Sequence, residues 1–303
     1  MSSPVRTLHP NTSTRSRTVA RTILGSVATR RTVAHARVLI TGAASGMGLL
    51  YAERAVAEGA RDVILWDRNG EKLESIAARL NTEPGRSRVH TYRVDIGEPT
   101  SIAENAERVL AEVGVPDVLI NNAGIVRGKY FWEHDIDSDI IETMRINALG
   151  PMLVTRAFLP RMIAGNRAVR IVNIASAAGM ISNPRMSVYA SSKWAVIGWS
   201  DSLRLELSQQ GHRHMTVTTV APSYISTGMF AGARGPVLTP IMTPEFVVDR
   251  VWTSMLAGKP LLLMPWSVHI AKVTKGLLPT AIWDQMADRV FHLYTTMEKF
   301  TGR

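Results

Sequence analysis

A tyrosine and a lysine four residues apart are the side chains in this sequence best suited to acid–base chemistry. Tyr189 and Lys193 stand at positions i and i+4, a spacing that places a phenol and an ammonium on one face of one helix. A free tyrosine has a pKa of about 10, too high for a base at neutral pH. A neighbouring lysine cation stabilises the phenolate and lowers that pKa. Taken alone, such a pair is also common on helix surfaces, so its meaning depends on the segments around it.

A glycine-rich turn after the first short apolar run is typical of a dinucleotide site. Glycines let a backbone turn tightly and approach a phosphate. The helix expected to begin near Gly46 would direct its N–H groups and positive dipole end at a pyrophosphate. A purely structural turn is the alternative. The cofactor-binding candidates in this turn are Gly42, Ser45, Gly46, Met47 and Gly48.

Two aspartates that follow the next two apolar runs bear on the choice of dinucleotide. Asp67 lies 25 residues past Gly42, where a carboxylate accepts hydrogen bonds from a ribose diol and repels a 2′-phosphate. This favours NAD. Arg68 argues the other way, because a guanidinium can pair with a 2′-phosphate, and NADP stays open. Asp95, followed by Ile96, could contact the adenine or cap the next helix.

Small and polar residues follow the fourth and fifth apolar runs. Asn122 precedes Ala123 and Gly124, so an amide can tie strand ends together while the small residues leave room for a flat ring. An ordinary turn is the alternative. Ser176 follows the fifth run, thirteen residues before Tyr189.

These segments require a scaffold that brings the ends of several strands together. Short runs rich in Val, Ile or Leu predict strands buried on both faces, at residues 38–40, 62–66, 89–94, 118–120, 170–174 and 216–220. Helix-length segments separate them, which predicts one α/β domain with a doubly wound parallel sheet, and the run at 261–266 predicts a seventh strand. Ligands bind at the carboxyl ends of such strands. For the helix that carries Tyr189, we expect Ser187 as N-cap and Gly211 beyond its end.

In this order and spacing, residues 37–225 resemble the classical short-chain dehydrogenase/reductase family. The resemblance rests on the glycine motif at 41–48, the Asn-Asn-Ala-Gly at 121–124 and the Tyr189–Lys193 pair. It implies a Rossmann fold, a nicotinamide cofactor and oxidoreduction of an alcohol. One departure is Ser223, where the family usually has glycine. The resemblance implies a catalytic tetrad of Asn147, Ser176, Tyr189 and Lys193, and further cofactor contacts from Tyr189, Lys193, Pro222, Ile225 and Thr227.

The resemblance also implies a mechanism. Tyr189 would remove the alcohol proton while hydride passes to the nicotinamide, or donate the proton in the reverse direction. Lys193 would lower the tyrosine pKa and hold the nicotinamide ribose, and Ser176 would orient the substrate oxygen. Asn147 would anchor a water in a proton relay.

Three segments, at 65–67, 225–230 and 297–303, resemble one branch of this family, which contains retinol dehydrogenases and 17β-hydroxysteroid dehydrogenases. Residues 223–246 stand where the family has a mobile substrate loop, and they include Tyr224, Met229, Phe230 and Ile241. An apolar, methionine-rich lining suits a lipophilic steroid, retinoid or long-chain alcohol. Packing of these residues on the core is the alternative.

Composition and charge exclude several other classes of protein. The chain has 303 residues, of which 46% are hydrophobic and 20% charged, so it can bury a core and is not generally disordered. It has no cysteine, which excludes disulfide scaffolds and thiol nucleophiles. Residues 1–37 hold seven arginines and no acidic residue, so most of the net charge of +10 lies there. We therefore expect no nucleic-acid partner for the folded part.

The two ends of the chain allow several interpretations. We assign residues 1–34 to a basic Ser/Thr/Arg-rich extension and 35–303 to the domain. The extension could be a solvated tail, a membrane-surface helix with Val19, Ile23 and Val27 on one face, or an organellar transit peptide. No apolar stretch reaches 18 residues, so a transmembrane helix is not expected. A cytoplasmic location, with or without peripheral membrane contact, is favoured, and organellar import stays open.

The apolar segment 259–303 contains a periodic set that includes Ile270, Val273, Leu277 and Ile282. It could cover the substrate entrance, dip into a membrane interface, or pack in the core or an oligomer, and we favour packing. Because the family commonly dimerises through the helices that would hold Asn147 and Tyr189, we expect a homodimer or homotetramer.

Two rival functions follow from the same residues. One is an NADPH-dependent ketoreductase of acyl thioesters, for which Arg68 is the weak support. The other is a non-catalytic dinucleotide-binding or membrane-associated interaction module. The intact set of Asn147, Ser176, Tyr189 and Lys193 argues against that module, because a sensor needs no proton relay.

Overall fold

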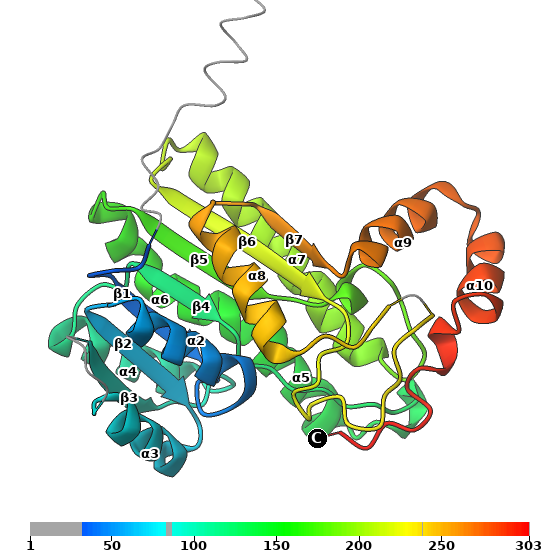
Figure 1. Ribbon diagram of the computed structural model, residues 1–303, viewed down its shortest axis with the longest axis horizontal. Helices are drawn as coiled ribbons and strands as arrows, with labels where there is room; N and C mark the ends of the chain where they lie inside the picture. Colours follow the sequence, from blue (N-terminus) through cyan, green and yellow to red (C-terminus); the bar gives the residue numbers. More distant parts are fainter. Residues whose placement is uncertain (1–31, 83–86, 238, 303) are drawn as a thin grey trace, which may run out of the picture.

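The computed structural model describes residues 32–82, 87–237 and 239–302. Seven parallel strands form one sheet in the order β3-β2-β1-β4-β5-β6-β7 (Figure 1). Every pair of neighbouring strands runs parallel, so the doubly wound sheet and its seventh strand are confirmed. The strands are β1 (Arg37–Thr41), β2 (Asp62–Asp67), β3 (Arg88–Arg93), β4 (Val118–Asn121), β5 (Val169–Ile174), β6 (Met215–Pro222) and β7 (Leu261–Met264).

The strand order reverses between β1 and β4, which lie side by side with Leu39 opposite Leu119. The chain builds outward from β1 through β2 to β3, and from β4 through β5 to β7. At such a switch point the connections that leave two adjacent strands diverge to opposite faces, which opens a crevice at the carboxyl ends of the strands.

Helices cover both faces of the sheet (Figure 1). One face packs against α2 (Gly46–Ala57), α3 (Gly70–Leu80) and α8 (Pro244–Leu256). The other packs against α4 (Pro99–Glu112), α6 (Gly150–Ala164) and α7 (Ser187–Gln209). Alternate residues of one strand therefore enter different cores: Val38 and Ile40 face the first, and Leu39 the second. This double burial is why the central strands, such as β1 and β4, are largely apolar, whereas the edge strand β3 (RVHTYR) is not.

Helix α7, which carries Tyr189 and Lys193, begins one residue earlier than the sequence suggested. Met186 holds the N-cap position without a side-chain cap hydrogen bond, and Ser187 is the first helical residue. The expectation that Ser187 is the N-cap was therefore wrong. Gly211, just beyond the end of α7, has a φ of +80°, a left-handed conformation that favours glycine.

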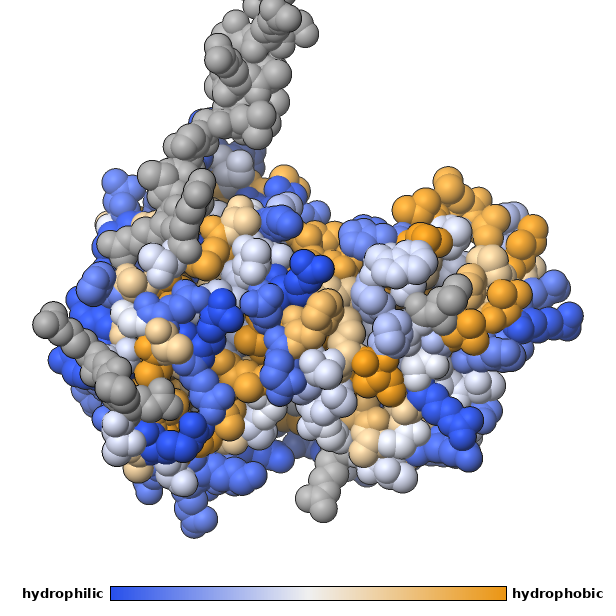
Figure 2. Space-filling model, in the orientation of Figure 1, coloured by the Kyte–Doolittle hydropathy of each residue, from blue (hydrophilic) through white to orange (hydrophobic). Residues whose placement is uncertain are grey.

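The chain continues past β7 into α9 (Trp266–Leu277), α10 (Thr280–Arg289) and the short turn η5 (Leu293–Thr295). Val268 and Trp283 pack with Ile181 in a separate apolar cluster. Val273, Leu277 and Ile282 are exposed, so packing in the core of this chain is wrong for these positions, whereas packing in an oligomer stays a prediction. Figure 2 shows hydrophobic side chains gathered over α9 and α10. Across the described residues, no helix combines the length and hydropathy needed to cross a membrane.

The basic extension falls almost entirely outside the described residues, including the expected helix face of Val19, Ile23 and Val27. Val33 is described, and it is fully buried in the core beside α2.

Candidate active site

A cleft of about 560 Å³ opens at the carboxyl ends of the central strands. Most of the residues singled out from the sequence as cofactor contacts line it together, although they come from six separate segments. These are Gly42, Ser45, Gly46, Met47, Asp67, Arg68, Asp95, Ile96, Asn122, Ala123, Gly124, Tyr189, Lys193, Pro222, Ile225 and Thr227.

Gly48 is the candidate that does not line the cleft. It is buried in α2, and a Cβ at this position would collide with the carbonyl oxygen of Gly42. Its role in this structure is to let the first turn of α2 lie directly on the glycine-rich turn.

The glycine-rich turn has the form that a bound phosphate requires. Gly42 has a φ of +67°, and a Cβ there would lie 2.8 Å from the Cα of Ala123. Gly46 has a φ of +54° and starts α2. Ser45 holds the N-cap position with no side-chain cap hydrogen bond, so the side chain does not occupy the positive end of the helix. The residues present therefore fit a dinucleotide pyrophosphate.

Asp67 fastens the glycine-rich turn to the end of β2. Its Oδ2 accepts a hydrogen bond from the N–H of Ala44 at 3.0 Å, and its Oδ1 accepts one from the N–H of Asn69 at 3.0 Å. Each carboxylate oxygen keeps a second lone pair for a ligand. Arg68 is exposed and lines the same cleft.

Asp95 closes a turn ahead of α4. Its Oδ1 accepts from the N–H of Gly97 at 2.8 Å, whereas Glu98 holds the N-cap position of α4. Of the two roles considered for Asp95, the direct helix cap is therefore wrong, and the side chain is left at the cleft surface.

Asn122 ties β4 to β1, as the sequence suggested. Its Nδ2 donates to the carbonyl oxygens of Thr41 at 3.0 Å and Gly42 at 3.3 Å. In return, the Oγ1 of Thr41 accepts from the N–H of Asn122 at 3.0 Å. These bonds fix the floor of the cleft at the switch point.

Ser176, Tyr189 and Lys193 meet at the inner end of the cleft, and all three are buried. The hydroxyl group of Ser176 is close enough to the phenol of Tyr189 to favour its phenolate form, and Ser176 Oγ also accepts from the N–H of Ala178 at 3.1 Å. Lys193 donates from Nζ to the carbonyl oxygen of Ile174 at 3.0 Å, and this Nζ lies 5.7 Å from the centre of the Tyr189 ring. The fold thus brings Ser176 and Tyr189 next to each other, although they are thirteen residues apart in the sequence.

Asn147 stands behind this group and does not line the cleft. It lies in η3 (Arg145–Leu149), a widened π-helical turn of the kind often found at functional sites. Its Oδ1 accepts from the N–H of Ile125 at 2.8 Å, and its Nδ2 donates to the carbonyl oxygen of Ile125 at 2.8 Å and to Ser192 Oγ at 3.1 Å. Asn147 therefore fastens the segment after β4 to α7.

Burial dominates the electrostatics of the tyrosine and the lysine. It raises the pKa of Tyr189 to about 12, although the hydrogen bond from Ser176 acts in the opposite direction. Burial lowers the pKa of Lys193 to about 8. The expectation that Lys193 holds the pKa of Tyr189 low was therefore wrong for the protein groups by themselves, because removing the phenolate from water costs more than its neighbours return.

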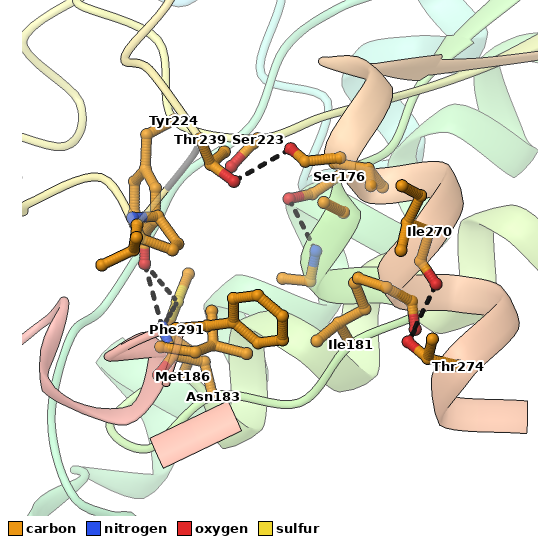
Figure 3. Close-up of a pocket in the computed structure, with 18 of the residues that line it drawn as sticks. Ser176, Ile181, Asn183, Met186, Ser223, Tyr224, Thr239, Ile270, Thr274 and Phe291 are labelled. Carbon is orange, nitrogen blue, oxygen red and sulfur yellow. Dashed lines mark hydrogen bonds between the residues drawn. The ribbon is translucent and has the colours of Figure 1, made fainter. Parts of the chain in front are cut away.

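A second, apolar pocket of about 150 Å³ adjoins the cleft (Figure 3). Ser176, Ser223 and Phe230 line both cavities, so the hydroxyl group of Ser176 stands where the two meet. The expected substrate loop supplies Tyr224 and Val237 to the pocket. Within the same loop Met229 lines the cleft, Met242 is buried, and Ile241 is exposed.

Two further segments contribute residues that the sequence analysis did not name as candidate site residues. Trp266, Ile270 and Thr274 of α9 line the apolar pocket, which supports a position over the substrate entrance, one of the alternatives considered for this segment. Thr301 and Gly302 line the cleft. The periodic apolar pattern pointed to α9, whereas residues 297–303 stand out in the sequence only by their resemblance to one branch of the family and not as residues of the cleft.

A dinucleotide cleft that ends at a hydroxyl pair and opens onto an apolar pocket defines an NAD(P)-dependent oxidoreductase acting on CH–OH groups. The sequence profile of the short chain dehydrogenase family matches residues 36–236. The chain belongs to this family.

Curated relatives and solved structures agree with this assignment. Over 279 residues, which cover 90% of this chain and 88% of the relative, 37% are identical to epidermal retinol dehydrogenase 2 of Mus musculus. Estradiol 17-beta-dehydrogenase 11 of Macaca fascicularis is 34% identical over 82% of this chain and 81% of its own. A short-chain dehydrogenase from Sphingobium yanoikuyae, solved in complex with NADPH, superimposes with a TM-score of 0.69 at 29% identity, covering 80% of this chain and 94% of the other.

Proposed function

We propose that this protein interconverts a lipophilic primary or secondary alcohol, of steroid, retinoid or long-chain type, and its carbonyl compound, with NAD as the preferred cofactor and Tyr189 as the acid/base. One observation carries the proposal: the neighbouring side chains of Ser176 and Tyr189 lie in the dinucleotide cleft, and Ser176 also lines the adjoining apolar pocket. A carbinol held at these hydroxyl groups would have its apolar body in the pocket and its reacting carbon beside the cofactor.

The chain's own residues divide the task of holding the cofactor. The turn from Gly42 to Met47 would take the pyrophosphate, and Asp67 the adenosine ribose. Lys193 would hold the nicotinamide ribose, and Thr227 the carboxamide. When bound, the oxidised dinucleotide supplies the hydride acceptor and a positive charge near the phenol.

Proton transfer would run through Tyr189. In the reductive direction its hydroxyl gives a proton to the carbonyl oxygen, and in the oxidative direction the phenolate takes the proton of the alcohol. Ser176 would orient the substrate oxygen by a hydrogen bond. Because burial keeps Tyr189 protonated at neutral pH, the protein groups by themselves favour the acid role. Asn147 would act indirectly, through Ile125 and Ser192.

Two observations favour a lipophilic alcohol over an acyl thioester. The pocket beside Ser176 is lined largely by apolar side chains from Ala177 to Leu293. The retinol and estradiol dehydrogenases named above are relatives over more than four fifths of this chain. Asp67 supports NAD, whereas Arg68 keeps NADP as the alternative cofactor.

The proposal also covers the oligomeric state, the location and the domain bounds of the protein. Trp194 and Leu205 of α7 and Leu149 of η3 are exposed apolar side chains, and they support a homodimer or homotetramer formed through these helices. The exposed residues of α9 and α10 support peripheral membrane contact from a cytoplasmic location. We keep residues 1–34 as the extension and 35–303 as the domain.

The test is an assay of cofactor-coupled turnover, in which the absorbance of NADH or NADPH reports the reaction. The panel contains all-trans-retinol, steroid alcohols, long-chain secondary alcohols and an acyl-thioester ketone. Tyr189→Phe should lower turnover by about 10²–10⁴-fold and leave dinucleotide affinity nearly unchanged. Tyr92→Phe, a buried tyrosine on the edge strand β3, is the matched control and should stay active. Full activity of Tyr189→Phe, or turnover of the thioester alone, would reject the proposal.

A further inference from the structure

Three buried polar side chains from distant parts of the chain meet beside the apolar pocket: Asn183, Tyr224 and Thr296, called here the Thr296 cluster. Asn183 Nδ2 donates to Tyr224 Oη at 2.9 Å and to Thr296 Oγ1 at 2.8 Å. The two hydroxyl oxygens lie 2.8 Å apart. Asn183 and Tyr224 line the pocket, and Figure 3 draws them with Met186 on one side of it.

The carbonyl oxygen of Leu293 fixes the direction of the hydrogen bonds at Thr296. Thr296 Oγ1 lies 2.8 Å from the carbonyl oxygen of Leu293, which can only accept, so the threonine hydroxyl donates there. Thr296 Oγ1 must then accept from Tyr224, and the amide of Asn183 supplies both of its hydrogens to the two hydroxyl groups. Met186 Sδ is a longer-range acceptor, 3.6 Å from Asn183 Nδ2 and 3.9 Å from Tyr224 Oη, and Asn183 Oδ1 is buried without a partner. The short bonds of the cluster therefore depend on the hydroxyl of Thr296 at its centre.

A chain of ring contacts connects the cluster to the acid/base residue. The ring of Tyr224 meets the ring of Phe230 edge to face, with centroids 5.4 Å apart. Phe230 in turn meets Tyr189 edge to face at 5.9 Å. Since Phe230 lines both the cleft and the apolar pocket, its position sets the width of the junction where a carbinol would stand.

The segment after Thr296 also binds the expected substrate loop, residues 223–246, through main-chain hydrogen bonds. The carbonyl oxygen of Thr296 accepts from the N–H of Arg234 at 2.9 Å, and the N–H of Thr301 donates to the carbonyl oxygen of Ala231 at 2.8 Å. Between them, Met297 is buried in one cluster with Tyr189 and Tyr224. Residues 296–301 thus hold residues 231–234 by main-chain bonds on both sides of Phe300.

We propose that Thr296 is a positioning residue for the substrate site. Through Tyr224 it fixes Phe230 at the junction of cleft and pocket, and so it sets how well an alcohol is held against Tyr189. This inference rests on the proposed function, because it assigns the junction to the alcohol. Thr296 itself does not line either cavity, which is why its effect must pass through its neighbours.

The kinetic test compares Thr296→Val, which removes the hydroxyl and keeps the shape, with Thr296→Ser, which keeps the hydroxyl. Thr295→Val is the matched control, because Thr295 is exposed and its hydroxyl group donates to the carbonyl oxygen of His292, outside the cluster. Thr296→Val should raise the KM of the alcohol about tenfold, with kcat and dinucleotide Kd within about twofold. Thr296→Ser should restore most of the KM. An unchanged KM in Thr296→Val, or an equal loss of dinucleotide affinity, would overturn the proposal.

A second measurement separates this proposal from the proposed function. Hydrogen exchange of residues 224–236 and 293–302 should accelerate in Thr296→Val and in Tyr224→Phe but not in Thr295→Val, whatever the wild type oxidises. If the wild type turns over no alcohol while exchange accelerates as expected, the proposed function fails and the positioning of the loop by Thr296 stands. Unchanged exchange in both Thr296→Val and Tyr224→Phe would overturn the positioning role even in an active enzyme.

Discussion

The ammonium of Lys193 lies 3.0 Å from the carbonyl oxygen of Ile174, the last residue of β5. This bond holds the lysine at the end of the strand that leads to Ser176. Both side chains of the Tyr189–Lys193 pair are almost fully buried. The pair therefore combines a proton carrier with a cation whose burial costs stability.

Lys193→Met should make the folded protein more stable at pH 7 while removing activity. The pKa of Lys193 is lowered by burial from 10.5 to about 8, so the unfolded chain binds this proton more tightly than the native state does. The penalty is complete below pH 8 and disappears as the pH rises toward 10.5. Chemical denaturation should give a gain on the order of 1–3 kcal/mol at pH 7 that shrinks between pH 8 and pH 10.

The control for this prediction is Lys72→Met, at an exposed lysine of α3, which should leave stability nearly unchanged at both pH values. A Lys193→Met protein that is less stable than the wild type at pH 7 would contradict the assignment of a burial penalty to this lysine.

Gly48→Ala should destabilise the fold because the new methyl group collides with the carbonyl of Gly42. We expect a loss of about 3 kcal/mol, typical of overpacking against backbone, together with weaker dinucleotide binding. Gly59→Ala provides the comparison. It has a φ of +73° and open space around its Cβ position, so it should cost only about 1 kcal/mol and leave binding unchanged. Equal effects of the two variants, measured by urea unfolding and NADH fluorescence, would refute the collision.

Asp67→Ala should change the choice of cofactor. Removing the carboxylate removes the ribose acceptor and the repulsion of a 2′-phosphate, so the ratio of kcat/KM for NAD to that for NADP should fall at least about tenfold. The loss of the bonds to Ala44 and Asn69 will also loosen the turn. Arg68→Ala should lower the NADP activity that remains. A constant ratio in Asp67→Ala would show that another group sets the preference.

Asn147→Ala distinguishes a bracing role from a direct role in the site. If Asn147 acts by fastening Ile125 to Ser192, its loss should lower the free energy of unfolding by about 2–3 kcal/mol, because three hydrogen bonds of a buried side chain disappear. Ser192→Ala, which removes one of them, should show a smaller loss in stability and in kcat/KM. Lost activity in Asn147→Ala at full stability would instead assign it to proton transfer.

The sheet could be predicted from the sequence because strands buried on both faces are apolar at nearly every position. The run at 118–120 became β4 (Val118–Asn121), and β1, β2, β5 and β6 likewise extend their predicted ranges by one or two residues at an end. β3 is shifted by one residue, and β7 ends two residues earlier than predicted. Residues at or just beyond the ends of strands, such as Asp67 and Ser176, could be placed at the cleft because parallel strands end at one edge of a sheet.

Contacts between distant segments could not be predicted in this way. Asn183 and Thr296 are 113 residues apart, and neither stands at the end of a strand. The pKa of Tyr189 was misjudged for a related reason: the i, i+4 spacing brings Lys193 to the same helix face, but only the fold reveals how deeply both groups are buried.

The cleft unites Gly42, at the first turn of the domain, with Gly302, at the far end of the described chain. Its walls also include residues that follow β2, β4, β5 and β6. A folding intermediate that lacks any of these segments therefore has no complete nucleotide surface. Recovery of the fluorescence of bound dinucleotide during refolding should be one of the last events, after the circular-dichroism signal of the helices has returned. The cofactor therefore reports when folding of this domain is complete.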